Sequence, residues 1–136
     1  KRWGLARLLS VETVGKGLAG RLFPKPEQAD LRQKMAQRRA RNDKRAYLKS
    51  FDAIVDWGVA ERIGQVGCPT LVIAADHDYT PIQLKQRYVA LIPQARLAVI
   101  EDSRHATPLD QPEVFNQTLL HFLAAASTSQ GSLSPC

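Results

Sequence analysis

Two short runs decide the fold of this sequence: Cys68–Pro81, CPTLVIAADHDYTP, and Ala95–His105, ARLAVIEDSRH. Each contains a β-rich apolar stretch that stops abruptly in polar residues, which is typical of a strand. The segment between them, Pro81–Ile92, places apolar residues at helical spacing and Lys85 to Arg87 on the predicted solvent side. A strand, a crossover helix and a second strand form a βαβ unit, in which the two strands run parallel. The sequence therefore predicts an α/β fold.

Two side chains follow these predicted strands at the points where the strands end. Asp78 comes after the first strand and His105 after the second. Ligands of open α/β sheets bind outside the carboxyl ends of the strands, and neighbouring strands run about 4.8 Å apart, so an acid on one loop can reach an imidazole on the next. A buried carboxylate fixes the tautomer and orientation of a histidine. Asp78 and His105 are therefore the candidate catalytic residues, two members of a nucleophile–His–acid triad.

The stretch Cys68–Leu123 resembles the C-terminal end of an α/β-hydrolase-fold protein. The order of acid before histidine also matches that family. Ala75 and Arg104 depart from the family pattern, which usually has glycine at both positions, and the second change bears on the loop that holds His105. The matching features are Pro69–Ile73, Asp78, the helix after Pro81, Ala95–Ile100, His105 and the Pro112–Phe115 entry to a closing helix.

The nucleophile expected from this resemblance is not in the sequence. No Gly-x-Ser-x-Gly elbow and no His-Gly-Gly oxyanion segment occurs. Both belong to the N-terminal half of the family's domain, so the resemblance implies that this chain is the back half of a hydrolase. A serine outside the chain would attack an acyl-type carbonyl, His105 would relay the proton, and Asp78 would orient His105. No cofactor or metal is expected, and the subclass of the small-molecule substrate stays open.

Composition divides the chain into three predicted segments. Residues 1–65 form a helical cap-like segment, residues 66–124 form the C-terminal portion of the hydrolase core, and residues 125–136 form a disordered tail rich in Ala and Ser. Within the first segment, Gly15, Gly17 and Gly20 are expected to break any helix. Polar helices are expected at about 27–41 and 43–53, joined at Asn42-Asp43, where either side chain can cap a helix.

Charge is unevenly distributed along the 136 residues. Fifteen of the 19 Lys and Arg residues lie within residues 1–66, and the net charge of the whole chain is +6. A basic helical segment can bind nucleic acid, but the interleaved aromatic residues of single-strand binders and any named nucleic-acid motif are missing, so nucleic acid is disfavoured as a partner. No apolar run reaches the length of a membrane span, which favours a cytoplasmic protein. Cys68 and Cys136 do not form a disulfide framework.

Other residues near the candidate pair allow alternative roles. Asp76, His77 and Asp78 crowd one loop and begin a metal-ligand set, but their spacing matches no recognised site. Asp102 is the second choice for the acid, although it lies on the same loop as the histidine that it would orient. Thr80 is a candidate cap for the crossover helix, with the following proline in its first turn.

A second function class stays open beside the enzyme. The chain is alternatively a non-catalytic remnant or interaction module, which would pair its exposed sheet edge with the missing N-terminal half or with another chain. A lone two-stranded sheet is marginal in water, and this favours association.

Overall fold

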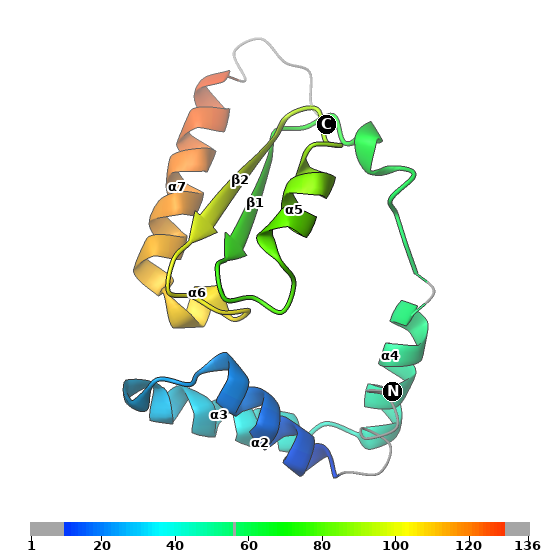
Figure 1. Ribbon diagram of the computed structural model, residues 1–136, viewed down its shortest axis with the longest axis vertical. Helices are drawn as coiled ribbons and strands as arrows, with labels where there is room; N and C mark the ends of the chain where they lie inside the picture. Colours follow the sequence, from blue (N-terminus) through cyan, green and yellow to red (C-terminus); the bar gives the residue numbers. More distant parts are fainter. Residues whose placement is uncertain (1–9, 56, 130–136) are drawn as a thin grey trace. The chain divides into compact units, whose positions relative to one another are not determined.

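The structure, a computed structural model, describes residues 10–55 and 57–129. The chain divides into two units between Gly58 and Val59, before the predicted boundary at residue 65. The first unit contains the helices α2 (Val11–Leu22), α3 (Ala29–Ala40) and α4 (Lys44–Val55) and a short 3-10 turn, Pro26–Gln28. The second contains a 3-10 turn at Ile63–Gln65, the strands β1 (Thr70–Ala75) and β2 (Ala95–Ile100), and the helices α5 (Ile82–Val89), α6 (Thr107–Asp110) and α7 (Pro112–Ser129) (Figure 1).

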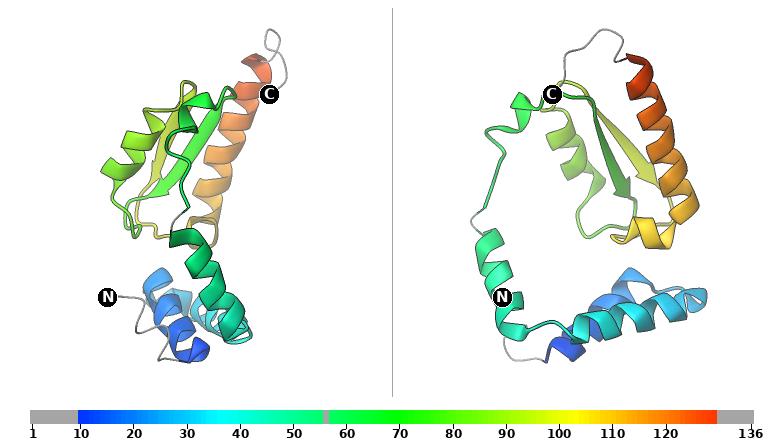
Figure 2. Two further views of the ribbon diagram at one scale, coloured as in Figure 1. Left: turned by 90° about the vertical axis from the view of Figure 1, so that its right-hand side faces the viewer. Right: turned by 180° about the vertical axis from the view of Figure 1, so that it is seen from behind.

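The second unit is the predicted α/β layer. Strands β1 and β2 pair in parallel, in a register that runs from Thr70 opposite Ala95 to Ala75 opposite Ile100. Helix α5 makes the crossover and covers one face of the sheet, while α7 covers the other (Figure 2). Ala74, Ala75 and Ile100 are buried, so the core reaches the carboxyl ends of both strands, where Asp78 and His105 follow. The parallel arrangement that the sequence predicted is confirmed.

Helix α5 departs from the predicted pattern at Leu84 and Lys85, while Ile82, Tyr88 and Val89 are half-buried as predicted. The side chain of Lys85 is buried, whereas Leu84, expected to face inward, is 48% exposed. Lys85 lies inside because its ammonium forms an ion pair there, which offsets the cost of burying a charge. Thr80 does not cap the helix, since the N-terminal flank is Pro81, whose carbonyl accepts from the amide of Leu84. The prediction of a Thr80 cap was therefore wrong.

Helix α2 in the first unit runs through glycines that were expected to break it. Its N-cap is Ser10, whose hydroxyl accepts from the amide of Thr13 at 3.1 Å. Gly15 is buried against α3, where an added Cβ would lie 3.1 Å from the Cβ of Arg39. The glycine allows the two helices to approach closely, and the packing offsets its low helix propensity. The prediction of a break was wrong because it weighed propensity without tertiary contacts.

The other two helices of the first unit agree with the sequence prediction. Helix α4 follows Asp43, whose carboxylate accepts from the amide of Ala46 at 2.7 Å in the manner of an N-cap. In α3, the guanidinium of Arg32 donates to the carbonyls of Phe23 and Lys25, at 2.7 and 2.6 Å. Arg32, one of the many basic residues of this unit, therefore stabilises the turn before α3.

The end of the described chain is helical where a tail was predicted. Helix α7 continues to Ser129, so residues 125–129 are helical and not disordered. Residues 130–136 lie outside the described residues. Across the described ranges, none of the helices combines the length and the apolar character needed to cross a bilayer.

Candidate functional site

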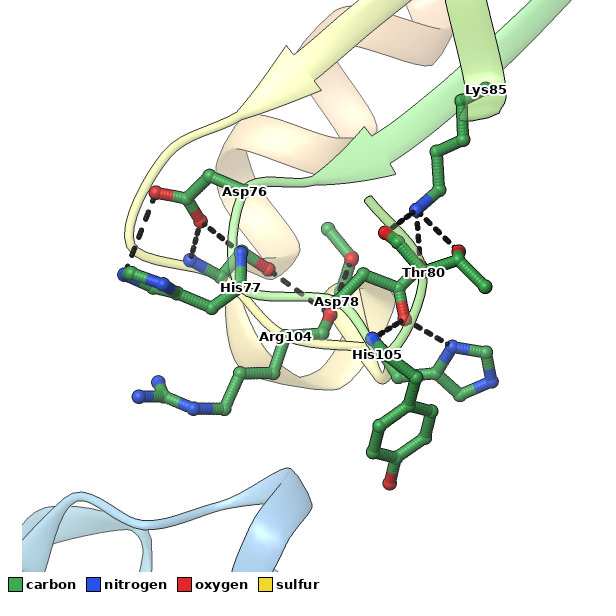
Figure 3. A network of polar contacts seen from close by, with 10 residues as sticks. Asp76, His77, Asp78, Thr80, Lys85, Arg104 and His105 are labelled. Atoms are coloured by element: carbon green, nitrogen blue, oxygen red, sulfur yellow. Dashed lines mark hydrogen bonds and ion pairs between the residues drawn. The ribbon is translucent and has the colours of Figure 1, made fainter. Parts of the chain in front are cut away.

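The loop after β1 presents Asp78 to three hydrogen-bond donors (Figure 3). Its Oδ1 lies 2.8 Å from Nδ1 of His105 and accepts from the backbone amide of Tyr79 at 2.6 Å. Its Oδ2 lies 2.9 Å from Nζ of Lys85, and the carboxylate side chain is only 11% exposed. The two residues that the sequence singled out therefore meet, and a lysine that it placed in solvent joins them.

His105 comes from the loop after β2 and points its ring at Asp78 (Figure 3). A carboxylate oxygen only accepts, so Nδ1 carries the proton and donates it to Asp78, which leaves Nε2 as the acceptor on the far side of the ring. The imidazole is 60% exposed, and the ring of Tyr79 lies beside it with centroids 4.8 Å apart and planes tilted by 36°. The basic nitrogen is thus accessible while the ring is held from the other side.

The surroundings of Asp78 keep its carboxyl ionised. Burial acts to raise the pKa of Asp78, but hydrogen bonds from Lys85, from His105 and from the amide of Tyr79 lower it, and the net pKa lies below its ordinary value. An ionised acid bonded to the Nδ1–H of a histidine stabilises the imidazolium that forms when Nε2 takes a proton. The pair can therefore serve as a general base and then as a general acid.

Asp76 links the loop after β1 to the loop after β2, which is a different role from that of Asp78. Its Oδ2 accepts from the amide of Asp102 at 2.9 Å, and its Oδ1 accepts from the amides of Ser103 at 3.0 Å and His77 at 2.9 Å. Burial acts to raise the pKa of Asp76, but these backbone hydrogen bonds, together with the nearby charge of His77, lower it below its ordinary value. Asp102, the second choice for the acid, has a left-handed backbone with φ of 51° at this junction.

The loop that holds His105 accommodates Arg104 without a glycine. The amide of Arg104 donates to Oδ2 of Asp110 at 2.8 Å, and its carbonyl accepts from the hydroxyl of Thr107 at 2.8 Å. Among the described non-glycine residues only Asp102 has a positive φ, so position 104 does not need glycine's conformational freedom. Helix α6 thereby fixes the residue directly before His105.

The metal hypothesis for the loop after β1 gains no support from the geometry. Within the described part of the chain, no group of three or more His, Cys, Asp or Glu side chains converges as metal ligands. The imidazole of His77 lies 3.7 Å from Asp76 and is more than half exposed. Asp76 and Asp78 are instead occupied by amides and by Lys85.

Lys85 is the site residue that sequence reasoning missed. Its position carried a signal, because Lys85 follows Ile82 by three residues and precedes Val89 by four, the spacing of one helix face. A lysine within an apolar stripe can bury its charge only beside a partner. That partner is the acid of the candidate pair.

Comparisons with known proteins agree with this architecture. No protein-family model matches the sequence. A putative carbamate hydrolase, RutD, of Agrobacterium fabrum is 33% identical over 82 residues, which are 60% of this chain and 29% of that protein. The polyketide synthase ThaQ of Burkholderia thailandensis is 40% identical over 75 residues, 54% of this chain and 4% of that protein.

Solved structures match over most of the chain. The enol-lactonase of Burkholderia xenovorans has a TM-score of 0.81 at 20% identity, over 90% of this chain and 48% of the enzyme. An esterase of Exiguobacterium antarcticum has a TM-score of 0.74 at 23% identity, over 83% of this chain and 42% of the enzyme.

These likenesses confirm the fold that the resemblance implied: the chain has the α/β-hydrolase fold over the part that it covers. The proteins to which it is similar are named as a putative carbamate hydrolase, an enol-lactonase and an esterase. The chain spans about half the length of the enol-lactonase and less than a third of the carbamate hydrolase.

Proposed function

We propose that this chain supplies the acid and the histidine of a hydrolase triad, with Asp78 and His105 in those roles and a serine-type nucleophile contributed from outside the chain. The observation that carries the proposal is the 2.8 Å contact between Oδ1 of Asp78 and Nδ1 of His105. The contact stands at the carboxyl ends of two neighbouring parallel strands, where ligands bind in open α/β sheets. The similarity to proteins named as hydrolases supports the same assignment.

The chemistry follows from which nitrogen of His105 is free. Nε2 takes the proton of the attacking serine hydroxyl as its oxygen bonds to the carbonyl carbon, and the resulting imidazolium is stabilised by Asp78. The imidazolium then gives this proton to the leaving group as the bond from the carbonyl carbon breaks. Water then attacks the acyl carbon while Nε2 takes one of its protons, and the imidazolium returns that proton to the serine oxygen as the acyl–serine bond breaks, which frees the acid product.

The proposed substrate class is a small acyl compound such as an ester, a lactone or a carbamate. The support is chemical: all three have an acyl carbon that a serine oxygen can attack, and three of the similar proteins are named as a putative carbamate hydrolase, an enol-lactonase and an esterase. Tyr79, whose ring lies beside that of His105, is 52% exposed and offers an apolar surface next to the imidazole. The nucleophile and the rest of the pocket would select among these substrates.

The proposed partner of this chain is the remainder of a hydrolase sheet. In the described residues the sheet has two strands, so each strand has one edge without a neighbour. Unpaired edges favour the addition of further strands, and a two-stranded sheet gains stability from them.

Steady-state hydrolysis by the polypeptide that the complete gene encodes tests the proposal. We expect Asp78→Asn to lower kcat by about 10⁴-fold, because an amide at this position favours the wrong histidine tautomer. Asp102→Asn is the matched control, since it removes the other acid near His105, and we expect it to retain most of the activity. A wild-type protein inactive on esters, lactones and carbamates would favour the non-catalytic remnant, and a loss confined to Asp102→Asn would reassign the acid.

A further inference from the structure

Lys85 holds an unusual position for a lysine, because its charge is buried and all of its donors are matched. The side chain is 7% exposed. Its Nζ lies 2.9 Å from Oδ2 of Asp78, 2.7 Å from the carbonyl oxygen of Thr80 and 2.8 Å from the hydroxyl oxygen of Thr80. An ammonium has three N–H donors, and these contacts account for three acceptors. Figure 3 shows Lys85 reaching from α5 to this cluster.

The contact of Lys85 restricts the carboxylate of Asp78. A carboxylate rotates about its terminal torsion with broad, two-fold freedom. Here Oδ2 is held by the ammonium of Lys85, and Oδ1 is held by the amide of Tyr79. Since the two oxygens have separate partners, Oδ1 stays aimed at His105.

We propose that Lys85 is a positioning residue of the triad, which fixes the carboxylate of Asp78 so that one oxygen faces Nδ1 of His105 and holds that ring in a single tautomer. The catalytic consequence rests on the proposed function. The positioning itself is a property of this chain and is testable without a nucleophile.

Other charged groups around Lys85 and Asp78 bind different partners. Asp76 binds the amides of the β2 loop and lies near His77. The backbone of Arg104 binds Asp110 of α6. Arg87 lies on α5 with an exposed side chain, two residues beyond Lys85. Of the cationic side chains on α5, Lys85 therefore contacts the acid, and Arg87 provides a matched control.

The first test is a nitrogen NMR spectrum of the histidines in the 136-residue chain, at a pH where imidazole is neutral. Wild type is expected to show His105 as the Nδ1–H tautomer. Lys85→Met removes the ammonium and is expected to shift both ring nitrogens of His105 toward a mixture of tautomers, whereas Arg87→Met leaves them unchanged. Wild-type nitrogen shifts in a folded Lys85→Met chain would overturn the proposal.

A second variant covers the case in which Lys85→Met does not fold. Lys85→Gln keeps hydrogen-bond donors near Thr80 but removes the charge and shortens the side chain, so it no longer holds Asp78 as an ammonium does. It is expected to shift the nitrogen signals of His105 in the same direction. Unchanged signals in this variant would equally overturn the proposal.

Kinetics of the polypeptide that the complete gene encodes give the catalytic readout. Misplacement of a catalytic group by about 1 Å can cost about 10²-fold in rate, so we expect Lys85→Met to lower kcat by about ten- to a hundredfold with KM within about twofold of wild type. Arg87→Met should behave as wild type. If wild type does not hydrolyse the substrates but Lys85→Met shifts the NMR signals of His105, the proposed function fails and the positioning role stands. A Lys85→Met enzyme with unchanged kcat contradicts the catalytic role.

Discussion

Replacement of Asp76 by alanine should destabilise the second unit more than the loss of any exposed acid. The carboxylate of Asp76 accepts from the amides of Asp102 and Ser103, which lie on the loop after β2. Ser103 is fully buried, so its amide would lose its acceptor in a place that water does not reach readily. The variant therefore removes the acceptor that links the β1 loop to the β2 loop.

The size of this effect follows from the two hydrogen bonds between the loops. Hydrogen bonds to charged groups contribute about 1.5–3 kcal/mol each, which gives about 3–6 kcal/mol for the pair. Because the Asp76 side chain is 30% exposed, water replaces part of this interaction and the lower end applies. We expect Asp76→Ala to lower the free energy of unfolding by about 3 kcal/mol. Asp76→Asn should cost less, because its amide group retains one acceptor oxygen.

Urea unfolding followed by far-UV circular dichroism measures this difference. With a slope of about 1–3 kcal/mol/M, the loss should move the unfolding midpoint of the second unit by about 1–3 M. Glu101→Ala is the matched control, because Glu101 is an exposed acid on the loop after β2, the loop that Asp76 binds. Amide hydrogen exchange of Ser103 should rise in parallel. If the Asp76→Ala variant unfolds at the same urea midpoint as the Glu101→Ala variant, the proposed link between the loops is refuted.

Three further predictions concern packing and pH. Gly17→Ala should raise the stability of the first unit by about 1 kcal/mol, since nothing lies within 4 Å of the added Cβ. Gly15→Val should lower the stability of this unit, because its side chain would crowd α3. Thermal unfolding compares the two variants. Phe23→Ala should cost about 3–5 kcal/mol in urea unfolding because the ring is fully buried. Folding lowers the pKa values of Asp76 and Asp78. The stability that these carboxylates give to the fold is therefore complete above the unfolded pKa of about 3.9 and is lost as the pH falls through the folded values. Urea midpoints at about pH 5 and pH 2.5 should differ more in wild type than in Asp76→Asn.

The part of the fold that the sequence predicted well is the part set by local pattern. The apolar runs Thr70–Ala75 and Ala95–Ile100 became paired parallel strands because a crossover helix separates them. The same topology brings Asp78 next to His105, as the order of strand ends predicted. Their catalytic roles stay predictions.

The predictions that failed depended on contacts that no local pattern contains. Gly15 lies in a helix because α3 packs against it, although its propensity alone predicts a break. The pattern places Lys85 in solvent because lysine is usually exposed, whereas its burial depends on the carboxylate of Asp78, seven residues earlier in the chain. The sequence offers Asp76 as a metal ligand, whereas two of its partners are backbone amides more than twenty residues away in sequence.

The most direct test of the central claim compares two histidines in one assay. His105→Ala and His77→Ala each remove an imidazole from the loops at the carboxyl end of the sheet, but only His105 contacts Asp78 in the described structure. In ester hydrolysis by the polypeptide that the complete gene encodes, we expect His105→Ala to lower kcat by about 10⁴-fold or more and His77→Ala to leave it within about threefold of wild type. Equal activities of the two variants would contradict the assignment of His105 to the triad.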